Sequence, residues 1–141
     1  MSNIYPIAKR KLMEGTLNLT TTSALKIALC KTGFTYDGTL TDVTAFLGGA
    51  LLVGTPVTLT TPTVSNTGGG TPNAVFDADD PTFTAVAALG GGDVIVGALI
   101  YQDANKWPVI FIDTGTGLPI TPNGGNITLN FSATSSRIFA L

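Results

Sequence analysis

Most apolar positions of this chain follow the period of a β-strand, but its beginning follows the period of a helix. The apolar residues that recur there at helical spacing are Ile4, Ile7, Ala8 and Leu12. This spacing predicts a short amphipathic helix over residues 4–14. Ser2 or Asn3 could cap it, Pro6 suits its first turn, and Gly15 is a natural stop.

After Gly15, apolar runs rich in β-branched residues alternate with Gly, Pro and Asn turns, which is typical of strands. The ranges with strand patterns are 24–31, 50–64, 74–89, 94–102, 107–113, 126–133 and 137–141. We expect 50–64 to hold one or two strands, interrupted by Gly54 and Pro56. Residues 94–102 are apolar almost throughout, so both faces of that strand should be covered.

The segments between the strands are expected to be turns and loops. Residues 32–49 form a long connection in which Thr41 or Asp42 could begin a single helical turn. The glycine-rich residues 66–73 predict a loop, and residues 103–106 predict the turn of a hairpin. The connections between the strands are otherwise short, which argues against crossover helices and favours antiparallel pairing.

Three finer expectations concern the second half of the chain. Phe83, Ala85 and Ala87 alternate with Thr84, Val86 and Ala88 and predict a strand after an acidic turn. Gly124 or Gly125 should supply the positive φ of a tight turn. In residues 126–133 the apolar positions on one face are Ile127, Leu129 and Phe131.

About eight strands with turns between them predict a mainly β fold. We expect a single antiparallel β-sandwich or small barrel over residues 1–141, with residues 1–15 as an N-terminal helical arm. The chain has 141 residues, which suits one domain.

The composition shows that this domain has few charged residues with which to cover its surface. Charged residues are 11% of the chain, against about 25% in ordinary soluble domains. Mean hydropathy is +0.38. The surface must therefore be covered by Thr, Asn, Ser and Gly, or hidden against other chains.

The side chains that usually perform catalysis are scarce. The chain has no His, so it lacks the most common general base and metal ligand. Cys30 is the only cysteine, which excludes an intrachain disulfide, and it lies in an apolar run where we expect a small buried hydrophobe. We expect no enzyme, no cofactor and no small-molecule substrate.

The densest polar cluster is formed by Asp77, Asp79 and Asp80. Three carboxylates could hold Ca²⁺, but the spacing matches no complete calcium loop. The favoured interpretation is an acidic turn whose side chains bond nearby backbone N–H groups before Pro81.

Charge is distributed unevenly along the chain. Residues 1–31 have a net charge of +4 and the remaining residues one of −6. The basic end, with Lys9, Arg10 and Lys11, could be a solvated helix face or could meet acidic surface on a neighbouring copy. Nucleic-acid binding is disfavoured because the basic run is short and has few aromatic partners.

Tyr101 and Trp107 flank the predicted hairpin turn and could belong to the core or anchor an interface; the core is favoured. No stretch approaches the length of a membrane span, so no membrane partner is expected. The first residues do not match a secretory signal, and we expect folding in a reducing cytoplasm.

Several motifs resemble those of small virion structural proteins of tailed bacteriophages. They are "IYPIAKRKLMEGTLNL", "LKIALC", "VFDADDPTFTAV", "GALIYQD" and "IDTGTGLPITPNGGNITLNFS…RIFAL". The resemblance covers most of the chain and implies a virion part, transferring no catalytic residue. Within that class we favour a capsid decoration (cement) protein on the head surface, assembled in the bacterial host cytoplasm.

That interpretation implies the major capsid protein and further copies of the chain, as a homotrimer, as partners. A tail or tail-fibre component is the alternative within the virion. A non-catalytic carbohydrate- or calcium-binding module is the alternative from another class.

Overall fold

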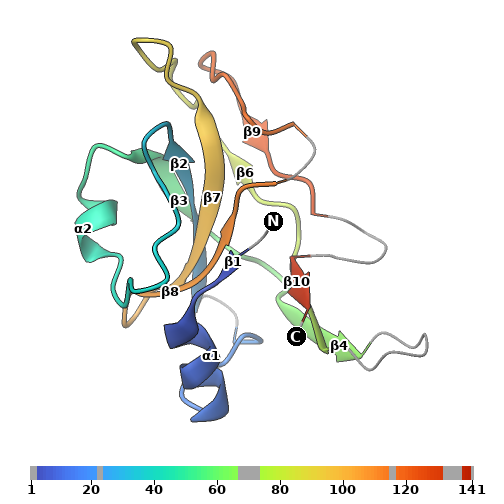
Figure 1. Cartoon of the computed structure of the whole chain (residues 1–141). Coiled ribbons are helices and arrows are strands. Elements are labelled where there is room, and N and C mark those ends of the chain that lie inside the picture. Colours follow the sequence, from blue (N-terminus) through green and yellow to red (C-terminus); the bar gives the residue numbers. More distant parts are fainter. Residues whose placement is uncertain (1–2, 22–23, 67–73, 115–116, 132–137, 141) are drawn as a thin grey trace.

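A computed structural model of the chain describes residues 3–21, 24–66, 74–114, 117–131 and 138–140. These residues form a mainly β, sandwich-like fold, as predicted (Figure 1). One layer is a five-stranded sheet, and the other contains a three-stranded and a two-stranded sheet. All the strand pairs are antiparallel.

The five-stranded sheet has the order β1-β8-β7-β2-β3. Its strands are β1 (Asn3–Ile4), β8 (Trp107–Ile112), β7 (Ile95–Gln102), β2 (Leu25–Lys31) and β3 (Leu52–Thr58). The apolar runs at 24–31, 94–102 and 107–113 thus become the three central strands. The hairpin between β7 and β8 is confirmed, with its turn at residues 103–106.

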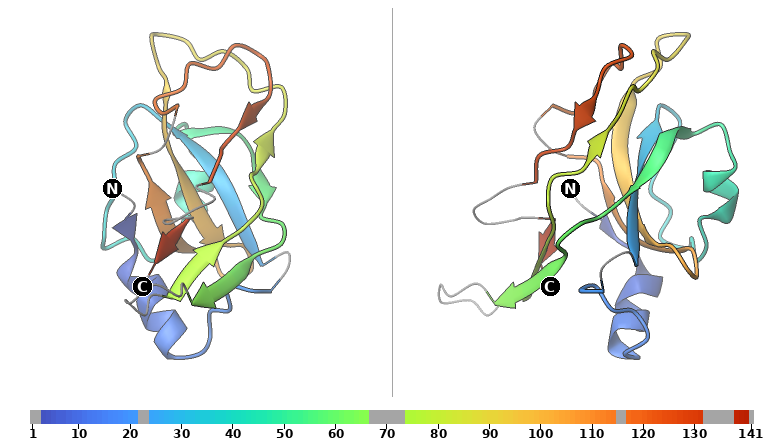
Figure 2. Two further views of the ribbon diagram at one scale, coloured as in Figure 1. Left: turned by 90° about the vertical axis from the view of Figure 1, so that its right-hand side faces the viewer. Right: turned by 180° about the vertical axis from the view of Figure 1, so that it is seen from behind.

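The second layer covers one face of this sheet (Figure 2). Its three-stranded sheet has the order β10-β5-β4, and its two-stranded sheet pairs β6 with β9. The strands are β4 (Thr63–Asn66), β5 (Ala74–Asp77), β6 (Thr82–Phe83), β9 (Ile127–Thr128) and β10 (Phe139–Ala140). The last short strand, expected at 137–141, is confirmed at β10.

Both faces of the central strands are buried, as the continuous apolar run predicted. Ile27, Ile100 and Ile110 lie opposite one another across β2, β7 and β8 and share one face. Their neighbours Ala28, Leu99 and Phe111 share the other. All six are less than 5% exposed, so each face is covered by other parts of the chain.

The N-terminal helix α1 (Pro6–Met13) packs on its own sheet, where Ile7 and Ala8 are buried. Its start differs from the expectation, because Ile4 belongs to β1 and pairs with Ile110. Asn3 is likewise in β1, and the N-cap residue is Tyr5, without a side-chain cap. The stop is as predicted: Gly15 follows the helix with φ of +70°.

Residues 50–64 give two strands, but the expected interruption was placed wrongly. Gly54 and Pro56 lie inside β3, and the break falls at residues 59–62. Two features allow Pro56 in a strand: β3 is an edge strand, and its register with β2 shifts between Ile27 and Leu29. At an edge or a bulge, a missing N–H donor costs little.

The strand expected through Phe83, Ala85 and Ala87 is wrong beyond Phe83. Ala85 has φ of +49°, which breaks the pleat, and Val86 is buried instead of Ala85 or Ala87. The N–H of Val86 donates to the carbonyl of Gly125 at 2.9 Å, which joins this segment to the next turn.

In that turn, the expected positive φ belongs to Gly124. The alternation of Ile127, Leu129 and Phe131 is confirmed by their partial burial, although β9 covers only Ile127 and Thr128. The loop expected at 66–73 lies outside the described residues after Asn66, as do residues 132–137.

Candidate functional site

The face of the sheet opposite the second layer is crossed by residues 32–51, here called the covering segment (Figures 1 and 2). It contains α2 (Thr44–Leu47), so the predicted helical turn is present, but its N-cap is Val43 and not the expected Thr41 or Asp42. The carboxylate of Asp42 accepts the N–H of Thr44 at 2.7 Å. Gly49 is required after the helix, because a Cβ there would lie 2.9 Å from the carbonyl oxygen of Ala45.

Hydrogen bonds hold the covering segment to the sheet at several points. The N–H of Thr32 donates to the carbonyl of Val94 at 2.9 Å, and the N–H of Val43 donates to that of Lys106 at 2.9 Å. Between them, the hydroxyl of Tyr36 donates to the carbonyl of Ile4 at 3.3 Å. The segment is therefore a fixed part of the fold.

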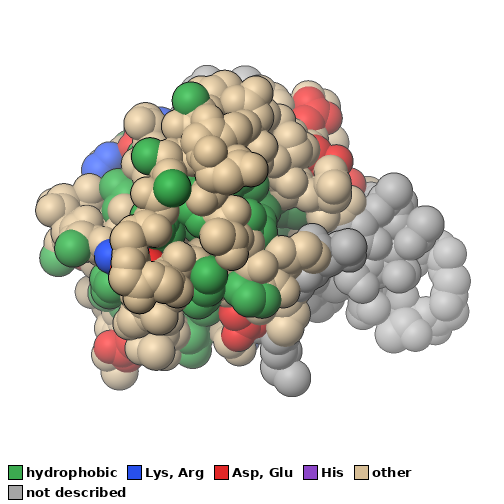
Figure 3. Space-filling view, turned by 90° about the horizontal axis from the view of Figure 1, so that it is seen from above, with side chains coloured by type: hydrophobic (Ala, Val, Ile, Leu, Met, Phe, Trp, Pro, Cys, Tyr) green, Lys and Arg blue, Asp and Glu red, His purple; other side chains and the backbone are tan. Residues whose placement is uncertain are grey.

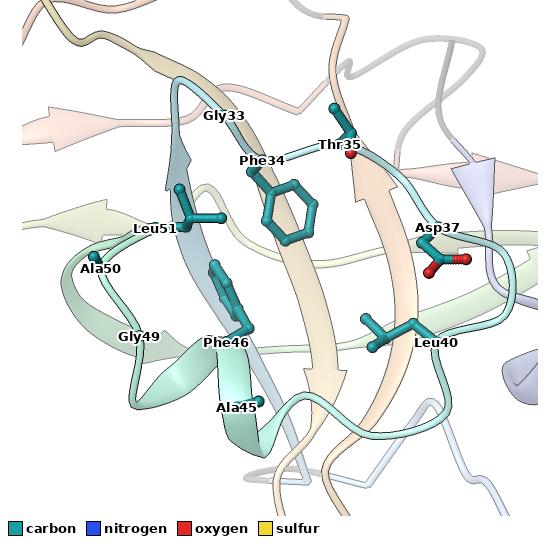
Figure 4. Close-up of a pocket in the computed structure, with 10 residues that line it drawn as sticks. All are labelled: Gly33, Phe34, Thr35, Asp37, Leu40, Ala45, Phe46, Gly49, Ala50 and Leu51. Atoms are coloured by element: carbon teal, nitrogen blue, oxygen red, sulfur yellow. The ribbon is translucent and has the colours of Figure 1, made fainter.

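A pocket of about 400 Å³ opens between α2 and the two ends of the covering segment. Its lining is mostly apolar, and Figure 4 shows Phe34, Phe46, Leu40 and Leu51 converging on it. The rings of Phe34 and Phe46 meet edge to face, with centroids 5.0 Å apart and planes at 67°. Phe34 also packs on Phe111 of the sheet, at 4.9 Å between centroids. The aromatic side of the pocket, formed by Phe34 and Phe46, is thus supported by the sheet.

Two carboxylates belong to the covering segment, and one of them lines this pocket. Asp37 lines it and accepts hydrogen bonds from the hydroxyl and the N–H of Thr39 at 2.6 and 2.9 Å. These bonds, the hydroxyl first, lower the pKa of Asp37. Hydrogen bonds from the side chain and N–H of Thr44 likewise lower the pKa of Asp42, which precedes α2. Both side chains therefore stay charged at neutral pH, and Asp37 places one negative charge at the pocket.

The chemistry of this site is that of a receptor for an apolar group. Phe and Leu side chains offer burial and ring contacts, and they supply neither a nucleophile nor a general base. This pocket could not be expected from the sequence, because its aromatic residues are spaced widely within a polar connection. The signal for the pocket that the sequence offered was the pair of isolated phenylalanines, Phe34 and Phe46.

The predicted acidic cluster is divided among separate structural contacts. Asp79 accepts hydrogen bonds from the hydroxyls of Thr60 and Thr61 at 3.1 and 2.6 Å. Asp80 accepts the N–H of Phe131 at 2.7 Å, a backbone bond of the expected kind. Asp77 belongs to β5. In the described part of the chain, no group of three or more carboxylates or thiols is arranged to hold a metal ion.

Cys30 and Tyr5 lie buried beneath the covering segment. The Cys30 thiol is 3.9 Å from the carbonyl oxygen of Ala28, and burial raises its pKa far above the usual range. Burial also raises the pKa of Tyr5, whose hydroxyl has no hydrogen-bond partner among the described residues. Its ring packs against that of Tyr36, with centroids 4.8 Å apart. Both groups are held in their neutral forms.

The two aromatic residues beside the hairpin turn differ in burial. Tyr101 is 2% exposed, as expected for the core, and burial raises its pKa to about 12. Trp107 is half-buried, and the Nζ of Lys11 lies 4.9 Å from its ring centroid. One of the predicted basic residues is therefore placed against the core by a cation–π contact.

The rest of the basic end is on the surface of α1. Lys9 and Arg10 are exposed, and Glu14 pairs with Arg10 and Lys11 at 3.5 and 2.7 Å. At the end of this helix, Met13 is 83% exposed. Figure 3 shows that charged groups are sparse on the visible part of the described surface.

Comparisons with known proteins give no match: no family model, no curated protein and no solved structure is similar to this chain. The resemblance to phage virion proteins therefore rests on the sequence motifs alone. Within the described residues, the helices are too short and too polar to cross a membrane.

Proposed function

We propose that this chain is a structural protein of a bacteriophage virion, most specifically a capsid decoration protein that binds the head shell and acts without catalysis. The observation that carries the proposal is that the chain has an open apolar pocket, whereas the carboxylates of its acidic cluster are bonded within the chain itself. The pocket is lined by Phe34, Phe46 and other apolar side chains. Asp79 and Asp80, by contrast, are bonded to the chain's own hydroxyl and N–H groups. Such a surface offers burial to a partner, as a binding protein requires.

The motif resemblance and the low charge support the same proposal. A protein on a capsid lattice works by burying surface at the junctions between shell subunits, typically about 1,600 Å² for each contact. Repetition around a symmetric oligomer, with a trimer as the proposed state, multiplies weak contacts without requiring any one of them to be strong. The major capsid protein would be its partner, and its role would be to resist the pressure of packaged DNA.

The test is to add the purified chain to expanded, empty capsids and to image them by cryo-electron microscopy. We expect ordered density at repeated positions on the shell. The matched control is the chain with Phe46→Ala and Leu40→Ala, which empties the apolar wall of the pocket and should reduce occupancy if this face touches the shell. Absence of density with the wild-type chain would contradict the proposal. Labelled chain seen at the tail of intact particles would instead indicate a tail component.

A further inference from the structure

We propose that strand β4 pairs with β4 of a second copy of this chain, antiparallel and across a twofold axis at Ser65. β4 is an outermost strand of the three-stranded sheet in the second layer, whose order is β10-β5-β4 (Figure 2). An edge strand turns a row of backbone N–H and C=O groups away from its own sheet, and these groups can accept a further strand.

The pairing inside the sheet shows which groups of β4 point outward. The carbonyl of Phe76 in β5 accepts the N–H of Ile138 at 3.1 Å, so the backbone groups of Phe76 point toward β10. In an antiparallel pair, the N–H and C=O groups of opposite residues point either toward each other or away from each other. Val64 lies opposite Phe76, and Asn66 lies two residues further along β4. The backbone groups of both residues therefore point away from β5 and form the open edge.

The other edges of the described sheets are blocked by means that β4 lacks. Edge strand β3 contains Pro56 and is shifted in register against β2. β1, β6, β9 and β10 have only two residues each. Natural proteins protect sheet edges by such prolines, irregularities and very short strands, or by charged side chains. β4 has four residues with the sequence TVSN, without charge or proline, and Val64 in it is 47% exposed.

A second copy of β4 matches this edge in charge and in register. Two uncharged strands meet without the repulsion that like charges on opposite strands cause. With the axis at Ser65, Val64 of each copy lies opposite Asn66 of the other, and the outward N–H and C=O groups of both residues find partners. With the axis at Val64, Asn66 would instead lie opposite Pro62, which has no N–H to donate. Pro62 therefore favours the register centred on Ser65.

This pairing would join two three-stranded sheets into one continuous sheet. The two Val64 side chains would lie diagonally across the axis on one face, where each covers part of the other's exposed surface. The inference goes beyond the proposed function, because a twofold contact is separate from the threefold contact of the proposed trimer and needs no capsid.

The first test is disulfide trapping of the full chain. Ser65→Cys places a thiol on the axis, where the Cα atoms of opposite residues are about 4.5 Å apart and a disulfide can form. Thr63→Cys is the matched control, because it lies on the same face of β4 but two residues from the axis. Under mild oxidation the Ser65→Cys chain should form a cross-linked dimer at least about tenfold faster than the control, as non-reducing electrophoresis measures. The native Cys30 is buried and should not contribute.

The second test removes a donor from the open edge of the Ser65→Cys chain. Val64→Pro deletes an outward N–H that β4 does not use to pair with β5, so the fold should survive, which circular dichroism checks. Cross-linking should then slow to the rate of the Thr63→Cys control. Val64→Glu keeps the N–H but brings two like charges together, so it should also slow cross-linking, most strongly at low salt.

Three outcomes would overturn the inference. They are a Ser65→Cys chain that stays monomeric on oxidation, equal cross-linking rates at positions 63 and 65, and a rate at position 65 that neither Val64→Pro nor Val64→Glu changes. Because no capsid is present in either test, failure here is distinguishable from failure to bind the shell.

Discussion

The ring of Phe111 lies so close to the backbone of Gly97 that a Cβ atom added at Gly97 would be 2.7 Å from it. The same Cβ would be 2.6 Å from the carbonyl oxygen of Ile112. Phe111 in turn supports Phe34, which forms one wall of the pocket. Because Gly97 has no side chain, the ring of Phe111 can lie close to β7. This position of Phe111 in turn sets the position of Phe34 at the candidate site.

Gly97→Ala is therefore expected to destabilise the fold by about 1–3 kcal/mol, the usual cost of forcing extra atoms into a packed site. Urea unfolding followed by tryptophan fluorescence measures this change. Gly90→Ala is the matched control, because nothing lies within 4 Å of a Cβ at that position. Its expected effect is neutral or slightly stabilising. Equal stability of the two variants would show that Phe111 does not rest on Gly97.

The contacts of Asp79 predict a structural role without calcium. Asp79→Ala removes the acceptor for the hydroxyls of Thr60 and Thr61, at a cost of about 0.5–1.5 kcal/mol. Thr61 has φ of +50°, so its conformation depends on such contacts. A double-mutant cycle with Thr61→Val should show coupling between the two side chains.

Addition of Ca²⁺ should leave the melting temperature of the wild type unchanged. A bound ion would raise it in proportion to the logarithm of its concentration above Kd. A rise that Asp79→Ala abolishes would restore the calcium-binding alternative. Mg²⁺ at the same concentration is the control for ionic strength.

The parts of the fold that could be predicted are those that local patterns determine. The run in β7 is apolar on both sides, which is possible only between two covering layers. Asp42 stands two residues before Thr44, where a carboxylate can bond an N–H group at the start of a helix. In each case the residue types needed for the structure are adjacent in the sequence.

The errors arise where distant parts of the chain decide the conformation. Ala85 adopts a positive φ because its N–H is held by the side chain of Asn126 at 3.0 Å and Val86 is held by Gly125. Nothing near Ala85 in the sequence indicates this. Likewise the sequence around Pro56 indicates a break, and the edge position of β3 together with its register shift against β2 makes a proline acceptable there.

The candidate site could not be predicted for the same reason. Phe34 and Phe46 lie twelve residues apart in the covering segment and Phe111 lies in β8, so only the path of the covering segment brings their rings together. Cys30 was predicted to be a buried hydrophobe because its neighbours are apolar, and it is fully buried.

Ion pairs around the hairpin turn predict a dependence of stability on acid pH. The carboxylate of Asp103 lies 2.7 Å from the Nζ of Lys106 and 3.0 Å from that of Lys26. Hydrogen bonds from these two groups, Lys106 first, lower the pKa of Asp103. Because the pKa is lower in the folded state, the pair stabilises the fold above the unfolded value of about 3.9. That stabilisation is lost as the pH falls through the folded value.

Asp103→Asn should therefore lower the stability at neutral pH by up to about 1 kcal/mol, as is usual for partly exposed pairs. It should also flatten the decline of stability in acid, which urea unfolding at a series of pH values measures. Lys26→Met should remove part of the same dependence. An unchanged acid profile for Asp103→Asn would show that other carboxylates account for it.

Burial of Cys30 predicts that its thiol reports on opening of the sheet. The side chain is 0% exposed near the end of β2, and burial raises its pKa, so both access and thiolate formation are blocked in the native state. A maleimide should label the native chain slowly, at the rate of global opening, and label it rapidly in urea. Met13→Cys supplies the control, because its added thiol is at an exposed position and should react at once while Cys30 stays protected. Immediate labelling of Cys30 in the wild-type chain would mean that the edge strand β3 separates from β2, its partner among the described strands, far more readily than the pairing of Cys30 with Leu52 implies.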